Sequence, residues 1–345
     1  MNDIPKVTPI EPGLLEMDIS PRPGETPVKK PVVAFSLDDV LKHKFPVREP
    51  VLSPVFLLGS MNMIFARRGI GKTHVSLGIA YAAASGDAFF GWQASRPFKT
   101  LFIDGEMPGE ALQERLAGII KSHANTPQPD HLKIATIDLN SGLMPDLSTT
   151  SGQDEMEPLC KDAELIIVDN LSCLVRSGKE NEAESWRLIA EWGLRLRSAG
   201  KCVIFIHHAG KNGEQRGTSK REDLLDVVLE LKRPGNYNPE EGARFIVQYS
   251  KARHLIGEQA KPFEACLQSD QSGNSTWTTK PASESTYEQV VELSNLGMTQ
   301  KEIADDLGIN KSNVCRAYKK AVDEGLIDKK QRSKPRKNYR ADLDG

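Results

Sequence analysis

Short apolar runs alternate with longer amphipathic stretches between about residues 51 and 270. The apolar runs predict strands, and the stretches between the first five of them predict helices that cover a parallel sheet. The last three runs follow one another without long helices, so antiparallel additions to the sheet are expected. The predicted strands are 61–66, 100–104, 132–137, 165–169, 202–207, 227–231, 245–249 and 263–267, and the predicted helices are 72–85, 109–122 and 182–199.

The two ends of the chain differ in pattern from its middle. Residues 1–50 contain nine prolines and little periodicity, which predicts an extended arm with a short helix near 37–41. Such an arm either packs on a neighbouring subunit or is a disordered tail. Polar residues 269–285 predict a linker behind a core domain of 51–268. A helical module, 286–330, and a basic tail, 331–345, follow.

The helical module has the signals of two short helices joined by a turn. Thr299 and Glu302 form a capping box at the start of the first helix, Gly308 ends it, and the second helix is expected at 312–324. This stretch is similar to winged-helix or resolvase-type helix-turn-helix modules, which implies duplex DNA as a partner. Residues 311–340 carry eleven Lys or Arg against three Asp or Glu, which suits phosphate contact. A protein-interaction role without DNA is the alternative. The residues expected to face a DNA groove are Asn310, Lys311, Ser312, Asn313 and Arg316.

A glycine-containing loop follows the first predicted strand. Residues 66–73 fit the phosphate-binding pattern G-x-x-x-x-G-K-[ST], except that Ala66 stands at the first glycine. The two remaining glycines let backbone N–H groups surround a β-phosphate at a helix N-terminus. Lys72 would bridge the β- and γ-phosphates of ATP, and Thr73 would hold Mg²⁺. The expected nucleotide-binding residues are Ala66, Arg67, Arg68, Gly69, Ile70, Gly71, Lys72, Thr73 and His74.

Two predicted strands end next to carboxylates that suit ATP hydrolysis. Strand 165–169 ends in Asp169, which would hold Mg²⁺ together with Thr73. Asn170 follows, so no adjacent glutamate can activate water at that strand. Strand 100–104 is expected to neighbour the phosphate-loop strand and leads to Glu106, which would orient and activate the attacking water. A solvated loop glutamate is the alternative.

Over about residues 50–268 the chain resembles the RecA-like ATPases. The likeness is carried by the phosphate loop, by Leu-Phe-Ile-Asp-Gly-Glu-Met-Pro at 101–108 and by Leu-Ile-Ile-Val-Asp-Asn at 165–170. Within that group the chain is most similar to RepA-type hexameric helicases of plasmids and related mobile elements, and more distantly to DnaB-type helicases. The resemblance implies an α/β fold: a RecA-like P-loop core of mainly parallel sheet flanked by helices, plus a small C-terminal all-α (winged) helix-turn-helix domain.

The resemblance also implies roles for polar residues further along the chain. His207 would sense the γ-phosphate, with His208 as the runner-up, and a structural pair of hydrogen-bonded histidines is the alternative. Arg253, assisted by Lys251, would act as an arginine finger in the neighbouring subunit's site, with Arg216 as the competing finger. A basic loop falls where RecA-like proteins contact single-stranded DNA, although it also fits a solvated surface loop. The candidate DNA contacts in this loop are Lys211, Arg216, Lys220 and Arg221.

Composition limits the remaining function classes. With 345 residues, 27% charged residues and a formal net charge of −2, any nucleic-acid contact is expected from local patches and not from the whole surface. The longest apolar runs are too short to cross a bilayer, and the N-terminus has no secretory pattern. The five cysteines are scattered without a CxxC pair. A cytoplasmic protein without a membrane partner or a zinc site is therefore expected.

Together these features predict a ring-forming motor that hydrolyses ATP with Mg²⁺ and moves on single-stranded DNA. The leading interpretation is a replicative DNA helicase of a plasmid, phage or integrated element, assembled as a homo-oligomer that is expected to be a hexamer. One alternative is a RecA-like recombination or repair ATPase that forms filaments and does not unwind DNA. The other is a DNA-binding regulator whose ATPase core controls oligomerisation only.

Overall fold

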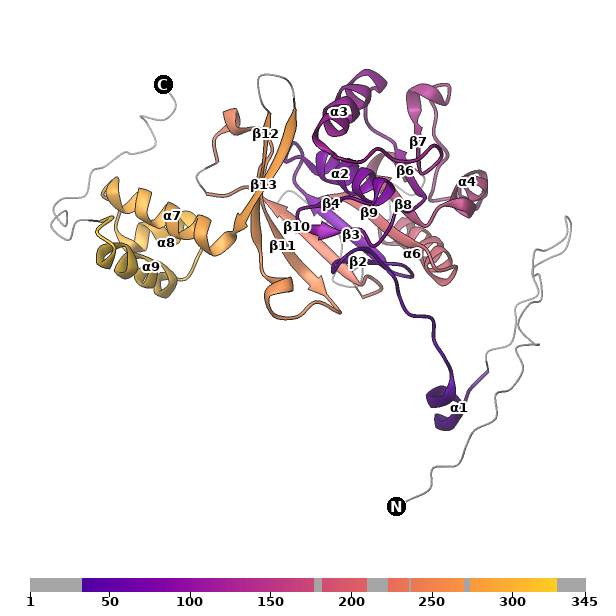
Figure 1. Cartoon of the computed structure of the whole chain (residues 1–345), viewed down its shortest axis with the longest axis horizontal. Coiled ribbons are helices and arrows are strands. Elements are labelled where there is room, and N and C mark those ends of the chain that lie inside the picture. Colours follow the sequence, from indigo (N-terminus) through magenta and orange to yellow (C-terminus); the bar gives the residue numbers. More distant parts are fainter. Residues whose placement is uncertain (1–32, 177–181, 210–222, 236, 270–273, 328–345) are drawn as a thin grey trace, which may run out of the picture. The chain divides into compact units, whose positions relative to one another are not determined.

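The computed structural model describes residues 33–176, 182–209, 223–235, 237–269 and 274–327 (Figure 1). The chain divides into two compact units, Met1–Val47 and Arg48–Gly345. Among the described residues, no helix is both long and apolar enough to span a lipid bilayer.

The described part of the first unit holds one short helix, α1 (Leu37–Lys42). Its N-terminus has a capping box, in which the Ser36 hydroxyl accepts from the Asp39 N–H at 3.1 Å and the Asp39 carboxylate accepts from the Ser36 N–H at 3.1 Å. No residue of this helix is buried. The predicted short helix is confirmed.

A nine-stranded sheet lies at the centre of the second unit (Figure 1). From one edge to the other its strands are β13 (Ser275–Pro281), β12 (Phe263–Ser269), β11 (Arg244–Ala252), β10 (Val227–Lys232), β3 (Met61–Ala66), β9 (Cys202–His208), β8 (Leu165–Asp169), β6 (Thr100–Asp104) and β7 (Leu132–Thr136). The six strands from β10 to β7 are parallel, and the pairs from β10 to β13 are antiparallel. The predicted mainly parallel sheet with antiparallel additions is therefore confirmed.

Helices cover both faces of this sheet. They are α2 (Lys72–Ser85), α3 (Gly109–Ser122), α4 (Thr150–Asp162), α5 (Leu171–Leu174) and α6 (Glu182–Ser198). Leu77 of α2 and Leu112 of α3 are buried in the apolar cluster on one face, and Met156 of α4 and Trp192 of α6 are buried in the cluster on the other. Successive strand residues alternate between these clusters, which explains why the strands read as continuous apolar runs. The pattern does not predict α4, which contains Pro158.

Several short elements connect these layers. They are β1 (Pro50–Leu52), β2 (Phe56–Leu57), β4 (Ala88–Phe89), β5 (Trp92–Gln93) and the 3₁₀ turns η1 (Ile137–Leu139), η3 (Pro239–Glu241) and η4 (Gly257–Ala260). β1 pairs with β2 and β4 pairs with β5, both antiparallel. None of these elements was expected from the sequence pattern, because each is too short to show a period.

The polar stretch interpreted as a linker contains a strand. β13 pairs with β12 over its whole length, from Ser275 opposite Ser269 to Pro281 opposite Phe263. Trp277 packs against Phe90, with 5.0 Å between the ring centroids. The prediction of a linker over 269–285 is therefore wrong for 275–285, where the sheet continues and a helix then begins. Several β13 side chains are exposed, and this exposure accounts for the polar composition.

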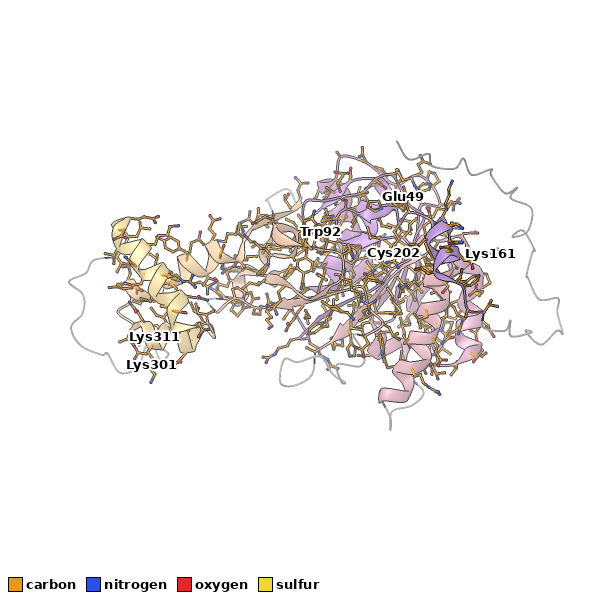
Figure 2. All side chains as sticks on the ribbon, turned by 90° about the horizontal axis from the view of Figure 1, so that it is seen from below. Glu49, Trp92, Lys161, Cys202, Lys301 and Lys311 are labelled. Carbon is orange, nitrogen blue, oxygen red and sulfur yellow. The ribbon has the colours of Figure 1, made fainter. Side chains whose placement is uncertain are left out.

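Three helices follow the sheet: α7 (Ala282–Asn295), α8 (Gln300–Leu307) and α9 (Lys311–Asp323). Lys311, the first residue of α9, is labelled in Figure 2. The predicted capping box of Thr299 and Glu302 is present, a feature that contributes about 1 kcal/mol. Val290, Ile303 and Val314 form a small apolar core between the helices. The expected C-terminal helices are confirmed, and in the described residues up to Ile327 no strand follows α9 to form a wing.

Candidate active site

The phosphate-binding loop lies between β3 and α2. Gly69 and Gly71 have positive φ angles of 75° and 119°, a region that glycine adopts without strain. The N-terminus of α2 has no side-chain cap, so its first N–H groups stay available to an anion. Ala66, by contrast, is the last residue of β3 and is paired with His208 of β9. Because Ala66 has ordinary strand backbone, this position does not require glycine, and an alanine fits where the usual pattern has glycine.

Lys72 lies over this loop and is 6% exposed. Its ammonium group donates to the carbonyl oxygens of Ala66 at 3.3 Å and Arg67 at 3.2 Å. Burial lowers the pKa of Lys72 below the usual lysine range, while the Asp169 and Glu106 carboxylates oppose that shift. The geometry fits a site in which phosphate oxygens complete the surroundings of the ammonium group.

Asp169 lies at the end of β8 and is 2% exposed. Its carboxylate accepts from the Ser76 hydroxyl at 2.7 Å, and the nearby Thr73 hydroxyl also favours its charged form. Burial raises the pKa of Asp169 to about 6, and the two hydroxyl groups partly oppose this shift. A buried carboxylate beside a threonine hydroxyl offers the oxygen donors that Mg²⁺ prefers when phosphate oxygens supply the rest. The predicted pair Thr73 and Asp169 is thus brought together.

Glu106 follows β6 and has a half-exposed side chain. The prediction that β6 neighbours β3 is wrong, because β9 and β8 lie between them. Glu106 still reaches the end of the inserted strands: its carboxylate accepts from the Asn170 amide and lies 3.6 Å from His208 Nε2. The carboxyl ends of parallel strands share one edge of a sheet, so Glu106 is gathered there with Lys72 and Asp169.

The two histidines of β9 lie on opposite faces of the sheet. Ile204 and Ile206 belong to the cluster under α2, and alternation places His208 on that face and His207 on the other. The contact with Glu106 is made by His208, whose pKa is lowered by burial. The runner-up residue, and not His207, therefore lies beside the candidate catalytic carboxylate.

Lys251 and Arg253 lie at the other end of the sheet from the phosphate loop of the same chain. Ala252 pairs with Val227, which pairs with Asn62, four residues before the end of β3. That offset corresponds to about 13 Å along the strand. The Arg253 guanidinium donates to the Asp223 carbonyl. Within one chain these two residues do not reach the phosphate loop, so a finger role requires a neighbouring subunit.

The predicted DNA contacts fall in two regions. Lys211, Arg216, Lys220 and Arg221 lie outside the described residues. The other five, Asn310, Lys311, Ser312, Asn313 and Arg316, are exposed at the N-cap and on the first turns of α9. Arg316 donates to the Asn313 side-chain oxygen at 2.7 Å. The described part of the chain thus presents one candidate nucleic-acid surface.

A pocket of about 510 Å³ adjoins the first turn of α2. It is lined by His74, by Arg115 and Lys121 of α3, and by Trp277 of β13. Burial and the neighbouring Arg115 charge lower the pKa of His74 to about 4, so this ring is neutral near pH 7. No sequence pattern points to Arg115 or Trp277 as pocket residues, because the pocket exists only where α2, α3 and β13 meet.

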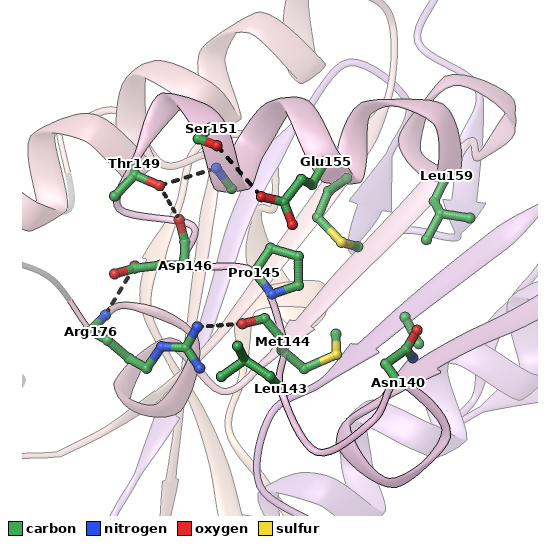
Figure 3. A pocket seen from close by; sticks show the side chains of 13 residues that line it. Asn140, Leu143, Met144, Pro145, Asp146, Thr149, Ser151, Glu155, Leu159 and Arg176 are labelled. Carbon is green, nitrogen blue, oxygen red and sulfur yellow. Dashed lines mark hydrogen bonds between the residues drawn. The ribbon is translucent and has the colours of Figure 1, made fainter.

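A second pocket, of about 610 Å³, lies beside η1 and α4 (Figure 3). Leu143, Pro145 and Leu159 are among its lining residues, and Arg176 donates from its guanidinium to the Met144 carbonyl. It contains none of the predicted site residues. This hollow is therefore separate from the candidate active site.

The raised pKa of Asp169 predicts a pH-dependent affinity for Mg²⁺. Protons compete with the cation for the carboxylate below about pH 6, so at about pH 5 Mg²⁺-dependent nucleotide binding should be about tenfold weaker than at neutral pH. Titration of Mg²⁺ at fixed nucleotide concentration across this range measures the effect. Asp169→Asn removes the titrating carboxyl group, so any pH dependence that remains in this variant comes from the nucleotide phosphate. If the affinity for Mg²⁺ falls with pH as steeply in the variant as in the wild type, the assignment to Asp169 is contradicted.

Comparisons with known proteins place the chain in a family. A family described as AAA domain matches residues 27–214, more than half of the chain. A KaiC-like protein from Pyrococcus horikoshii OT3 has 13% identity and a TM-score of 0.45, covering 68% of this chain and 100% of its own. The flagellar accessory protein FlaH from Methanocaldococcus jannaschii has 10% identity and a TM-score of 0.46, covering 66% and 93%. Similarity at this level says nothing about function, and no curated protein matches in sequence. On the family match, the chain belongs to the AAA domain family of P-loop ATPases.

Proposed function

We propose that the chain hydrolyses ATP to drive work on DNA, as a ring-forming DNA motor of the helicase type. The observation that carries the hydrolytic part is the gathering of Lys72, Asp169 and Glu106 at one edge of the sheet. Family membership supports ATP and Mg²⁺ as the ligands in general. Exposed basic residues on α9 support DNA as the partner.

Each of the three residues has a separate part in the proposed reaction. Glu106 takes a proton from water as the water oxygen attacks the γ-phosphorus, and the bond from that phosphorus to the β–γ bridging oxygen breaks. Lys72 stabilises negative charge on the β- and γ-phosphates. Asp169 and Thr73 would hold Mg²⁺, which would supply further positive charge to the phosphates. Asn170 and His208 keep the Glu106 carboxylate at this edge.

The pocket beside His74 suits the nucleoside part of ATP. It begins at the residue after Thr73 and is large enough for a base and a sugar at about 510 Å³. Trp277 offers an aromatic face and Arg115 a planar cation, groups that pack against bases. This location would leave the triphosphate on the loop and the base between α2, α3 and β13.

One observation favours a second candidate, the ATP-switched DNA-binding regulator. α7 packs directly against the sheet, where the Ser285 hydroxyl donates to the buried Glu264 carboxylate. A DNA-binding module fixed to an ATPase core in this way suits control of DNA binding by nucleotide. The motor and the regulator differ in what single-stranded DNA does to hydrolysis.

Replacement of the proposed base should stop turnover and spare nucleotide binding. Glu106→Gln keeps the size of the side chain but cannot accept a proton, so kcat should fall by about 10²–10⁴-fold. Binding of a fluorescent ATP analogue should change by less than about threefold, because binding depends on the loop and Lys72. Glu110→Gln, at the exposed start of α3, is the matched control. Turnover within twofold of the wild type would remove Glu106 from this role.

Strand displacement separates the motor from its alternatives. With a forked DNA substrate and ATP, the motor should release the shorter strand, and single-stranded DNA should stimulate hydrolysis at least about tenfold. Glu106→Gln is the matched inactive control. Strand exchange without unwinding would favour the recombinase, whereas duplex binding with no stimulation by single strands would favour the regulator.

The basic face of α9 should carry duplex DNA binding. Lys311→Ala and Arg316→Ala each remove one phosphate or base contact, so the affinity should fall about tenfold and the salt dependence should become shallower. Lys161→Ala, an exposed lysine of α4 in the ATPase core, is the control (Figure 2). Fluorescence anisotropy at several salt concentrations measures both quantities, and equal losses in all three variants would argue against a DNA-binding α9.

A further inference from the structure

The connection between β10 and β11, which lies between Lys232 and Arg244, contacts the phosphate loop together with the start of β11. Two contacts are present. The Arg233 guanidinium donates through Nη2 to the Gly69 carbonyl at 2.8 Å. At Gly71 the fit is close: an added Cβ would lie 3.2 Å from Ala243 Cβ and 3.3 Å from Phe245 Cε1. Both positive-φ glycines of the loop therefore lie against this connection.

Arg233 is itself held by the connection. Its Nη1 donates to the carbonyls of Gly242 at 2.9 Å and Arg244 at 2.8 Å, and its guanidinium carbon lies 3.6 Å from the centroid of the Tyr237 ring. A guanidinium is a rigid planar fork of five donors and holds several carbonyls in a fixed arrangement, whereas the ammonium group of a lysine is a compact charge on a flexible stem. Arg233 thus ties the position of Gly69 to the start of β11.

The same connection contacts the C-terminal helices. A Cβ added at Gly235 would lie 2.8 Å from Leu307 Cδ2 and 3.5 Å from the Gln289 side-chain oxygen. Leu307 is the last residue of α8, where the turn of the helix-turn-helix begins. The connection therefore packs on the phosphate loop at one side and on α7 and α8 at the other.

A buried chain of polar groups forms a second route between the same parts. Arg244 donates to the Glu264 carboxylate at 3.0 Å and 3.2 Å, and that carboxylate accepts from the Ser285 hydroxyl of α7. Gln289 in turn donates to the Ser285 hydroxyl at 3.2 Å. These residues are 9% exposed or less, so breaking one contact leaves a largely buried charge or polar group with fewer partners.

We propose that the β10–β11 connection couples nucleotide binding at the phosphate loop to the C-terminal helices, with Arg233 as the positioning residue. Ala243 and Phe245 contact the loop, and Arg244 between them holds Glu264, so a displacement of the loop is transmitted to both. A nucleotide that fixes the loop should also suppress local opening of α7 and α8. Coupling of this kind is reciprocal, so a ligand of the helices changes nucleotide affinity by the same factor. The inference rests on the proposed function only in requiring nucleotide at the loop.

Amide hydrogen exchange on the full chain tests the link. With Mg²⁺ and a non-hydrolysable ATP analogue, exchange in residues 282–309 of the wild type should slow about fivefold or more. In Arg233→Ala and Arg233→Lys the analogue should still bind, but the slowing should fall below about twofold because the carbonyl bridge is lost. Gly235→Ala displaces the Leu307 side chain at the helix end of the connection and should give the same loss with unchanged nucleotide affinity. Lys232→Ala, the exposed neighbour, should keep the full slowing.

A parallel binding measurement distinguishes the possible failures. If the wild type binds the analogue without slower exchange in 282–309, the link is overturned and the proposed ATPase function stands. If the wild type does not bind the analogue, both are overturned. If Arg233→Ala loses nucleotide binding, Gly235→Ala decides, and full slowing in that variant would overturn the link.

Discussion

Burial of two opposite charges at one end of the parallel sheet is the constraint on which the site depends. Lys72 is 6% exposed and Asp169 is 2% exposed, and removing such ions from water costs roughly several kcal/mol each. Two backbone carbonyls and the Ser76 and Thr73 hydroxyls compensate only part of this cost. The uncompensated part of this cost lowers the pKa of Lys72 and raises the pKa of Asp169. Phosphate oxygens and a cation would complete the compensation, so the site suits a charged ligand.

The sequence predicts those parts of the site that are local in the chain. Buried parallel strands read as apolar runs, and the phosphate loop, Asp169 and Glu106 each follow such a run within a few residues. Which histidine lies beside Glu106 depends instead on the register of β3 and β9. Ala66 pairs with His208, so His208 lies on the same face of the sheet as Ala66 and His207 lies on the other face. The insertion of β9 and β8 between β3 and β6 is likewise long-range, and a single sequence contains no record of it.

The misassigned linker has a related cause. β13 lies at the edge of the sheet and contributes one large aromatic side chain, Trp277, to a run of polar residues. Its conformation is set by seven pairs with β12 and by aromatic packing against residues nearly 190 positions earlier, such as Phe90. The amino-acid composition of residues 269–285 does not predict any of these contacts. For the same reason the pocket formed by α2, α3 and β13 had no signal in the sequence.

β11 spans the distance between the two ends of the sheet. Its first residue, Arg244, lies beside the phosphate loop and the C-terminal helices, and Arg253 follows its last residue at the opposite end. Nine residues of strand extend about 30 Å, and bonding to β10 and β12 makes such a strand stiff. If Arg253 enters a neighbouring subunit's site, as the resemblance to RecA-like ATPases implies, a single strand would connect a chain's own nucleotide with the next one. Hydrolysis around a ring would then be coupled through β11, and the C-terminal helices would act on that coupling where they contact Arg244 through Glu264.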